Sequence, residues 1–206
     1  MGAGVMVVAE WLLECSREFV ARKDELDGLD RLLGDGDHGT NMVRGFAAAE
    51  DLDLSAQQHA AEALRQVGMA LVQNVGGASG PLFGTFFLRA GAHWDPSLTT
   101  HGIAVAVREA MRGVQARGKA TVGDKTMIDA LAPASASLDA SAAAGEDVAV
   151  ALEKAAAAAE HGRDATVDMV AKKGRAALKA DQSVGVVDPG AVSMALILRT
   201  AVRHIG

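Results

Sequence analysis

Apolar residues recur at helical spacing along most of the chain, and this periodicity limits the fold more than any other feature. The first such stripe, at i, i+4, i+7 and i+11, consists of Val8, Leu12, Cys15 and Phe19. Similar stripes occur in later segments, and residues 145–165 are rich in alanine, which has the highest helix propensity. Residues 183–187 form the only short stretch that a β-strand could occupy. The sequence therefore predicts an all-α fold of about eight amphipathic helices joined by short loops.

The chain is expected to form a single domain over residues 1–206. Its length permits one large domain or two small ones, and no internal repeat or linker-like boundary is evident. The alanine-rich stretch 132–159 keeps apolar positions at helical spacing, which indicates folded helix rather than a linker. Near the C-terminus, Pro189 suits the first position of a last helix, with Asp188 as its N-cap.

Composition excludes several classes of function. The single cysteine, Cys15, rules out an intrachain disulfide and a cysteine-rich zinc site, which fits a reducing cytoplasm. No stretch reaches the roughly 18 uncharged apolar residues of a membrane span. Lysine and arginine total 20 against 26 aspartates and glutamates, which gives a net charge of −6, and aromatic residues make up only 3%. We therefore expect a cytoplasmic protein with no membrane or nucleic-acid partner.

Four polar, glycine-rich loops separate the helical segments. They comprise residues 34–41 (GDGDHGTN), 76–80 (GGASG), 123–126 (GDKT) and 188–190 (DPG). Because consecutive antiparallel helices alternate their ends, several of these loops can meet at one end of a helical bundle. A functional site on such a scaffold is expected at that end.

Asp30, Asp35 and Asp37 place three carboxylates within eight residues. Like charges held close together repel, so such a cluster is costly unless a cation lies among them. Mg²⁺ binds a few carboxylates together with water and substrate phosphates, whereas the EF-hand pattern of a Ca²⁺ loop is absent. The alternative is a solvated acidic turn in which Asp37 or Thr40 caps the next helix. The flanking glycines and the third carboxylate favour the metal site.

The residues that follow this cluster suit an anion. Helical spacing resumes after Asn41, so a helix is expected to start near Thr40 and Asn41, with backbone N–H groups facing a phosphate. His38 is interpreted as a hydrogen-bond donor to a phosphate or as a supporting partner that orients a carboxylate. A lone loop histidine is more often exposed or a supporting partner than directly catalytic. Residues 76–80 could admit a phosphate, or form a plain turn with Ser79 as N-cap. The chain contains no Walker A loop.

Three further side chains have two interpretations each. Lys125 could neutralise a phosphate or pair with a surface carboxylate. Met127 could line an adenine pocket or belong to the core. Arg175 could clamp a phosphate with two hydrogen bonds or lie on a solvated basic helix face. The residues alone leave these alternatives open.

In combination, the loops resemble those of the nucleotide-binding L subunit, or L domain, of dihydroxyacetone kinases. The run 34–41 is the signature of that family, and 76–84 (GGASGPLFG), 123–127 (GDKTM) and 188–193 (DPGAVS) follow in the family's order and spacing. The resemblance covers about residues 30–193. It implies a barrel of eight antiparallel helices with a nucleotide bound at one end.

The resemblance also implies the residues of the site. Asp30, Asp35 and Asp37 would hold two Mg²⁺ ions that bridge the phosphates of ADP or ATP. The residues implied to bind the nucleotide are His38, Gly39, Thr40, Asn41, Ser79, Gly80, Gly118, Met127, Arg175, Asp188, Pro189 and Gly190. Residues 180–187 depart from the family, whose members often carry Gly-Glu-Arg-Ser and a histidine there.

The function implied by the resemblance needs a partner. Such an L subunit transfers a phosphoryl group from Mg-bound nucleotide to dihydroxyacetone held on a separate K subunit, and it is inactive alone. ADP would be a retained coenzyme, recharged by a phosphotransferase-system protein. The alternatives are an ATP-consuming kinase subunit, a kinase subunit for another small ketose, and a non-catalytic regulatory module that binds nucleotide. A homodimer and a purely structural role of the glycine loops are left open.

Overall fold

The computed structural model describes residues 3–54 and 57–206, so residues 1–2 and 55–56 of the expected domain lie outside the described part. The α-helices in the described part are α1 (Ala3–Ala21), α2 (Lys23–Leu33), α3 (His38–Glu50), α4 (Ala60–Asn74), α5 (Ser79–Ala92), α6 (Thr100–Gly118), α7 (Met127–Ala143), α8 (Val148–Ala165) and α9 (Pro189–Ile205). Two 3₁₀ elements, η2 (Thr166–Asp168) and η3 (Arg175–Gln182), lie between α8 and α9.

The all-α prediction is confirmed, and the described residues form nine α-helices where about eight were expected. Residues 183–187, the stretch open to a strand, form a turn and a bend instead, and the described residues contain no strand. No helix within the described ranges combines the length and the hydropathy needed to cross a bilayer.

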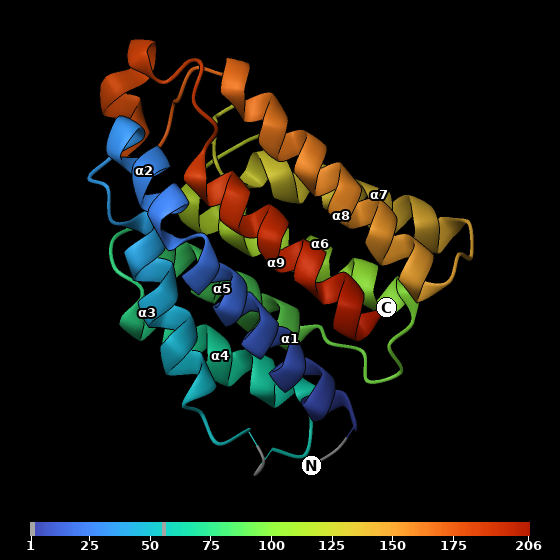
Figure 1. Cartoon of the computed structure of the whole chain (residues 1–206). Helices are drawn as coiled ribbons and strands as arrows, with labels where there is room; N and C mark the ends of the chain where they lie inside the picture. Colours follow the sequence, from blue (N-terminus) through green and yellow to red (C-terminus); the bar gives the residue numbers. More distant parts are fainter. Residues whose placement is uncertain (1–2, 55–56) are drawn as a thin grey trace.

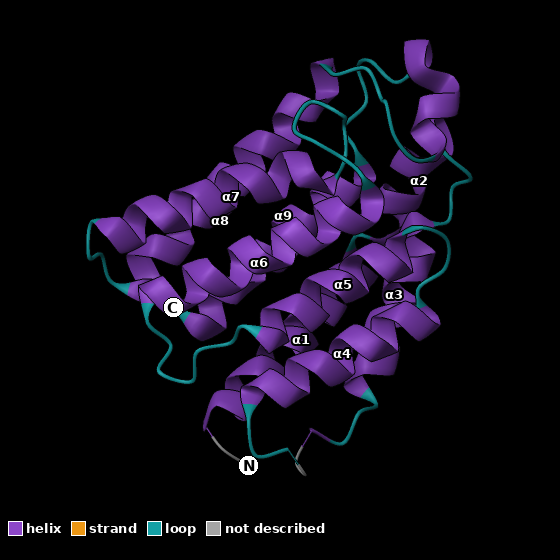
Figure 2. Ribbon diagram, turned by 180° about the vertical axis from the view of Figure 1, so that it is seen from behind, coloured by secondary structure: helices purple, strands orange, loops and turns teal. Residues whose placement is uncertain are grey.

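The helices pack as neighbours in chain order, and the last returns to the first. From α3 onward each helix contacts the next one along the chain, up to the pair α8 and α9. Because α9 packs against α1 and α1 against α3, these eight helices make a closed circuit of contacts. The short helix α2 lies at one end, beside η3 (Figure 1). Figure 2 shows from behind that the long connections between α8 and α9 lie at this same end.

One continuous cluster of buried apolar side chains draws on all nine helices. Phe87 on α5 is fully buried within it and contacts three other aromatic rings, with centroids 5.3 to 6.1 Å away. These rings are Trp11, Phe46 and Phe86. The indole N–H of Trp11 also donates to the carbonyl oxygen of Ile197 at 3.0 Å, which ties α1 to α9.

Capping side chains determine where α7 and α9 begin. Asp188 Oδ2 accepts a hydrogen bond from the backbone N–H of Ala191 at 2.7 Å, and Pro189 lies in the first turn of α9, as predicted. Thr126 caps α7 in a reciprocal capping box with Asp129. The caps therefore fix where the loops 123–126 and 188–190 end, directly before the first turns of α7 and α9.

Candidate functional site

A cavity of about 480 Å³ opens where the glycine-rich loops meet. All four loops contribute to its wall, and so do residues 173–176, which lead into η3. The convergence predicted from alternating helix ends is therefore confirmed. Among the expected site residues, those that line this cavity are Asp30, Asp35, Asp37, His38, Asn41, Ser79, Gly118, Met127, Arg175, Asp188, Pro189 and Gly190.

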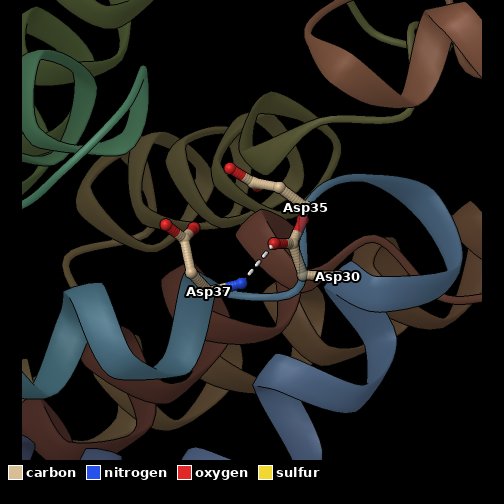
Figure 3. Close-up of side chains that lie close together, drawn as sticks. All are labelled: Asp30, Asp35 and Asp37. Atoms are coloured by element: carbon tan, nitrogen blue, oxygen red, sulfur yellow. Dashed lines mark hydrogen bonds between the residues drawn. The ribbon is translucent and has the colours of Figure 1, made fainter.

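The three expected metal-binding carboxylates come together in the wall of this cavity. One oxygen from each of Asp30, Asp35 and Asp37 lies within 4.8 Å of the others. Asp30 Oδ2 accepts hydrogen bonds from the backbone N–H groups of Gly36 (2.8 Å) and Asp37 (3.0 Å). Figure 3 shows the bond to Asp37, with the side chains of Asp35 and Asp37 directed to the same side of the loop. Gly36 has a φ of +82°, a conformation that favours glycine and lets the chain turn back onto Asp30.

The possible ligand atoms of this cluster fit a hard divalent cation. All its side-chain donors are carboxylate oxygens, and Asp35 and Asp37 are exposed while Asp30 is half-buried. Three negative charges at this separation repel one another, and a divalent cation removes that repulsion. Mg²⁺ commonly takes a few carboxylates and leaves its other positions to water and phosphate oxygens. The arrangement can therefore hold Mg²⁺ against the phosphates of a ligand in the cavity.

His38 is buried and its ring is held on both sides by hydroxyl groups. Its Nε2 lies 2.8 Å from Ser193 Oγ, and its Nδ1 lies 3.2 Å from Ser79 Oγ. Burial lowers the pKa of His38, so its neutral form dominates at pH 7. Ser193 ends the 188–193 motif but was not among the expected site residues, because the local sequence does not show that its side chain reaches His38. The geometry favours the supporting interpretation of His38, in which it orients the Ser79 hydroxyl.

The N-termini of four helices lie at the cavity, since α3, α5, α7 and α9 begin with or directly after residues that line it. Unpaired N–H groups and the helix dipole make such ends favourable for an anion.

The expected helix start near Thr40 and Asn41 is wrong by about two residues, because α3 begins at His38. The alternative interpretation of Ser79 as an N-cap is wrong, because Ser79 is the first residue of α5. Asp37, an alternative cap of α3, makes no side-chain capping bond within the described part of the chain.

Two glycines of the expected site lie against neighbouring backbone rather than in the cavity wall. A β-carbon on Gly39 would collide with the carbonyl oxygen of Lys23, and one on Gly80 would collide with that of Val75. Each position therefore needs glycine so that two helices can approach closely at the head of the site.

Thr40 also lies outside the cavity wall and serves the helix start instead. Its backbone N–H and its hydroxyl donate to the two carboxylate oxygens of Asp27, at 2.9 and 2.8 Å. Lys23 donates to the same carboxylate at 3.0 Å. These bonds fix the first turn of α3 against α2 and so help to hold the acidic loop in place.

The other part of the cavity wall is apolar. Its side chains come from α2, α5, α6 and α7, and they are Leu33, Leu82, Phe83, Val114, Met127 and Ile128. An apolar pocket beside an anion site suits a flat organic group joined to phosphates. Met127 is both buried and cavity-lining, so the two interpretations of this residue are compatible. The remaining members were missed because at helical spacing they are indistinguishable from core residues.

Sequence comparison identifies the family. The family model described as the DAK2 domain matches residues 32–203. The chain belongs to the DAK2 domain family. A 43% identical relative from Escherichia coli (strain K12) is the PEP-dependent dihydroxyacetone kinase, ADP-binding subunit DhaL, and the match covers 93% of both chains. A D-erythrulose kinase from Mycolicibacterium smegmatis is 36% identical over 96% of this chain, but over only 35% of its own length.

Solved structures give the same family. The native dihydroxyacetone kinase of C. freundii aligns with a TM-score of 0.71 and 28% identity, covering 98% of this chain. The same kinase in complex with AMP-PNP and Mg²⁺ aligns with a TM-score of 0.70 and 26% identity. This chain spans 34% of each of those longer chains. The family expected from the four loops is therefore confirmed.

In this DAK2 domain, Arg175 pairs with a residue of the acidic cluster. Its guanidinium forms an ion pair with Asp35, and its side chain is exposed. Lys179 lies nearby and approaches the carbonyl oxygens of Leu32 and Gly34, at 3.4 and 3.3 Å. Arg175 therefore reaches the site, as expected of a residue that could contact a phosphate, and the interpretation as a purely solvated basic face is not supported.

Of the two sequence interpretations of Lys125, pairing with a surface carboxylate is wrong for this DAK2 domain, whereas neutralising a phosphate stays a prediction. Its side chain is buried, and its ammonium is bound by backbone carbonyl oxygens rather than by a surface carboxylate. Burial lowers the pKa of Lys125, while the charges of Asp188 and Asp168 act in the opposite direction. The sequence signal was misleading because Lys125 lies in a polar loop, where a lysine is normally solvated.

Asp188 is a buried carboxylate in the cavity wall of the DAK2 domain. Burial raises the pKa of Asp188 to about 7, and the negative charge of Asp129 acts in the same direction. The hydrogen bond from the Ala191 N–H and the nearby charge of Lys125 oppose this shift. Since the folded-state pKa lies above the ordinary aspartate value of 3.8, the folded protein holds a proton that the unfolded chain has already lost between these pH values.

The contribution of Asp188 to stability is therefore expected to fall as pH rises from about 4 to about 7, and to stay constant above that range. Asp188→Asn keeps a capping oxygen but removes the buried charge. The free energy of unfolding of the variant minus that of the wild type should rise across this pH range, by about 1–4 kcal/mol in total. Urea titrations at several pH values would measure this difference. A difference independent of pH would contradict the prediction.

Proposed function

We propose that this chain is the nucleotide-binding subunit of a dihydroxyacetone kinase. It would pass a phosphoryl group from Mg-bound nucleotide to dihydroxyacetone on a separate K subunit. The observation that carries the proposal is the meeting of three carboxylates, four helix N-termini and an apolar pocket in one cavity. The relationship to the E. coli ADP-binding subunit, over 93% of both chains, supports it.

The residues around the cavity would have separate roles in binding the metal ions and the nucleotide. Asp30, Asp35 and Asp37 would hold two Mg²⁺ ions, which supply charge neutralisation for the nucleotide phosphates. The N–H groups at the helix starts would bind the phosphates, and Arg175 would add a positive charge beside them. The residues proposed to contact the nucleotide are Asn41, Ser79, Gly118, Met127, Arg175, Asp188, Pro189 and Gly190, and His38 would support them by orienting the Ser79 hydroxyl. Gly39, Thr40 and Gly80 would shape the backbone that receives the phosphates.

The descriptions of the relatives support a proposal for the partners and the nucleotide cycle. The E. coli relative is described as PEP-dependent and the Lactococcus lactis relative as PTS-dependent, and both match over at least 93% of their length. We propose the same arrangement here, with ADP as a retained coenzyme recharged by a phosphotransferase-system protein in the cytoplasm. An ATP-consuming subunit for another ketose is the second candidate, because erythrulose kinases are 36% and 37% identical. In those proteins the match covers about a third of a longer chain.

We also infer that residues 1–206 form one domain, with eight helices closed as a barrel. The circuit of helix contacts that returns from α9 to α1 supports this arrangement. The continuous buried cluster shared by all nine helices supports a single domain.

The decisive experiment identifies the nucleotide that the purified protein carries. Acid denaturation of protein purified without added nucleotide should release about one ADP per chain, and dihydroxyacetone phosphorylation should then require both a K subunit and the phosphotransferase donor. An empty protein that binds Mg-ATP and consumes it with the K subunit would support the ATP-dependent alternative. Nucleotide binding without any activity in the complete system would indicate a regulatory module. A protein that binds neither nucleotide in the presence of Mg²⁺ would exclude the proposal.

A further inference from the structure

The wall segment, residues 169–187, forms one side of the cavity but has little apolar packing of its own. Four of its residues line the cavity: Lys173, Gly174, Arg175 and Ala176. None of the residues of η3, all of which the structure describes, is buried, and Leu178 is 87% exposed. Polar contacts must therefore hold this segment in place.

Lys125 provides the densest group of these contacts. Its Nζ donates to four backbone carbonyl oxygens, those of Thr166 (2.6 Å), Met169 (3.1 Å), Ser183 (2.7 Å) and Val186 (2.6 Å). Two of these carbonyls lie where the wall segment leaves α8 and η2, and two lie where it returns to α9. A single ammonium group therefore joins both ends of the wall segment.

The surroundings of this ammonium suit a charged group with no access to water. The Lys125 side chain is only 1% exposed, so the carbonyl oxygens take the place of a hydration shell. An ammonium has three N–H donors and a neutral amine has two, so four acceptors match the charged form better. Lys125 also has a φ of +62°, an uncommon conformation for a residue other than glycine, which persists only where the surrounding structure determines it.

Other hydrogen bonds connect the wall segment to the loop that carries Lys125. The backbone N–H of Lys172 donates to the carbonyl oxygen of Asp124 at 3.1 Å. Within the segment, the N–H of Ala171 donates to the hydroxyl of Ser183 at 2.8 Å, and this serine is fully buried. The loop 123–126 and the wall segment thus form one connected polar unit beside the cavity.

We propose that Lys125 is a positioning residue that holds the wall segment against the cavity and thereby controls the rate at which nucleotide leaves. This role rests on the proposed function, because it requires a nucleotide in the cavity. Loss of the ammonium would remove one donor from each of these four carbonyl groups, although those of Thr166 and Ser183 would keep a backbone N–H donor, so the ends of the wall segment would separate more often. Lys173 and Arg175 would then leave their places beside the phosphates.

The test compares Lys125→Met and Lys125→Gln with Lys172→Met as the matched control. Methionine keeps the length of the side chain without any donor, and glutamine keeps two N–H donors, which preserves a folded protein if methionine does not. The Lys172 side chain belongs to the same segment and is 60% exposed, and its ion pair with Asp124, at 3.9 Å, is long and solvated at the lysine end, so it contributes little. Its loss therefore removes one positive charge without exposing buried carbonyls. Hydrogen–deuterium exchange is measured without nucleotide, and release of a fluorescent ADP analogue is measured with Mg²⁺.

Both Lys125 variants are expected to show faster exchange in residues 169–187 with little change in α4 and α5. Release of the ADP analogue should be about tenfold faster or more, with a much smaller change in its association rate, as expected when buried carbonyls lose their donor. The control should match the wild type in both measurements. Wild-type exchange and release rates in the Lys125 variants, or an equal rise of exchange in every helix, would overturn the proposal. If the wild-type protein binds no ADP, the proposed function fails, while exchange without nucleotide still decides whether Lys125 holds the segment.

Discussion

Asp37→Asn is expected to lower phosphoryl transfer by about 10²–10³-fold, the scale seen when one group that stabilises charge in the transition state is removed. The Asp37 carboxylate is exposed and lies with Asp30 and Asp35 in the acidic cluster, whereas the bond that Asp37 gives to the loop comes from its backbone N–H. Asparagine keeps that backbone bond and nearly the same shape, so the loop should be retained while one negative ligand is lost. Coupled assays with the K subunit would measure transfer, and calorimetry would measure nucleotide binding as a function of Mg²⁺ concentration.

The matched control for this substitution is Asp51→Asn. Asp51 is also exposed, but it lies at the opposite end of α3 from the acidic cluster. The control should leave transfer and the dependence of binding on Mg²⁺ unchanged. If Asp37→Asn behaves like the control, the carboxylates do not hold the metal, and the assignment of Asp30 and Asp35 loses its basis as well.

Phe87→Ala is expected to lower the free energy of unfolding by about 3–5 kcal/mol, the range for removal of a buried phenylalanine ring. Phe87 is fully buried and contacts the rings of Trp11, Phe46 and Phe86, which lie on α1, α3 and α5. Removing its ring leaves a cavity and ends three ring contacts at once. Denaturation by urea, followed by circular dichroism, would measure the change.

Leu178→Ala is the control for this second prediction. Leu178 is 87% exposed on η3, so its truncation should change stability by less than about 0.5 kcal/mol. A loss below about 1 kcal/mol for Phe87→Ala would mean that the aromatic cluster repacks without a cavity, which contradicts the close contact of Phe87 with these three rings.

The helices and the acidic cluster could be predicted because their signals are local in the sequence. Apolar spacing marks each amphipathic helix, and the pair Asp188 and Pro189 marks the start of α9. Asp30, Asp35 and Asp37 are near neighbours along the chain, so a single turn suffices to bring their carboxylates together. The position of each loop at the same end of the molecule follows from the alternation of helix ends.

The parts that could not be predicted depend on contacts between distant residues. Lys125 donates to carbonyl groups that lie 41 to 61 positions away in the sequence, and the sequence of its own loop does not predict these partners. Ser193 reaches His38 across 155 positions. The apolar wall residues Leu82 and Val114 differ from core residues only in facing a cavity, which spacing along one helix does not reveal.

The contact between the first helix and the last has a consequence for synthesis of the chain. Trp11 on α1 finds its backbone acceptor at Ile197, 186 residues later. At about 5–20 residues per second, a ribosome needs roughly 10–40 s to make the intervening chain. Throughout that interval the apolar face of α1 lacks the helix that finally covers it. The nascent chain is therefore expected to depend on chaperones until α9 has been synthesised. A variant without α9 should aggregate or be degraded rather than form a smaller stable protein.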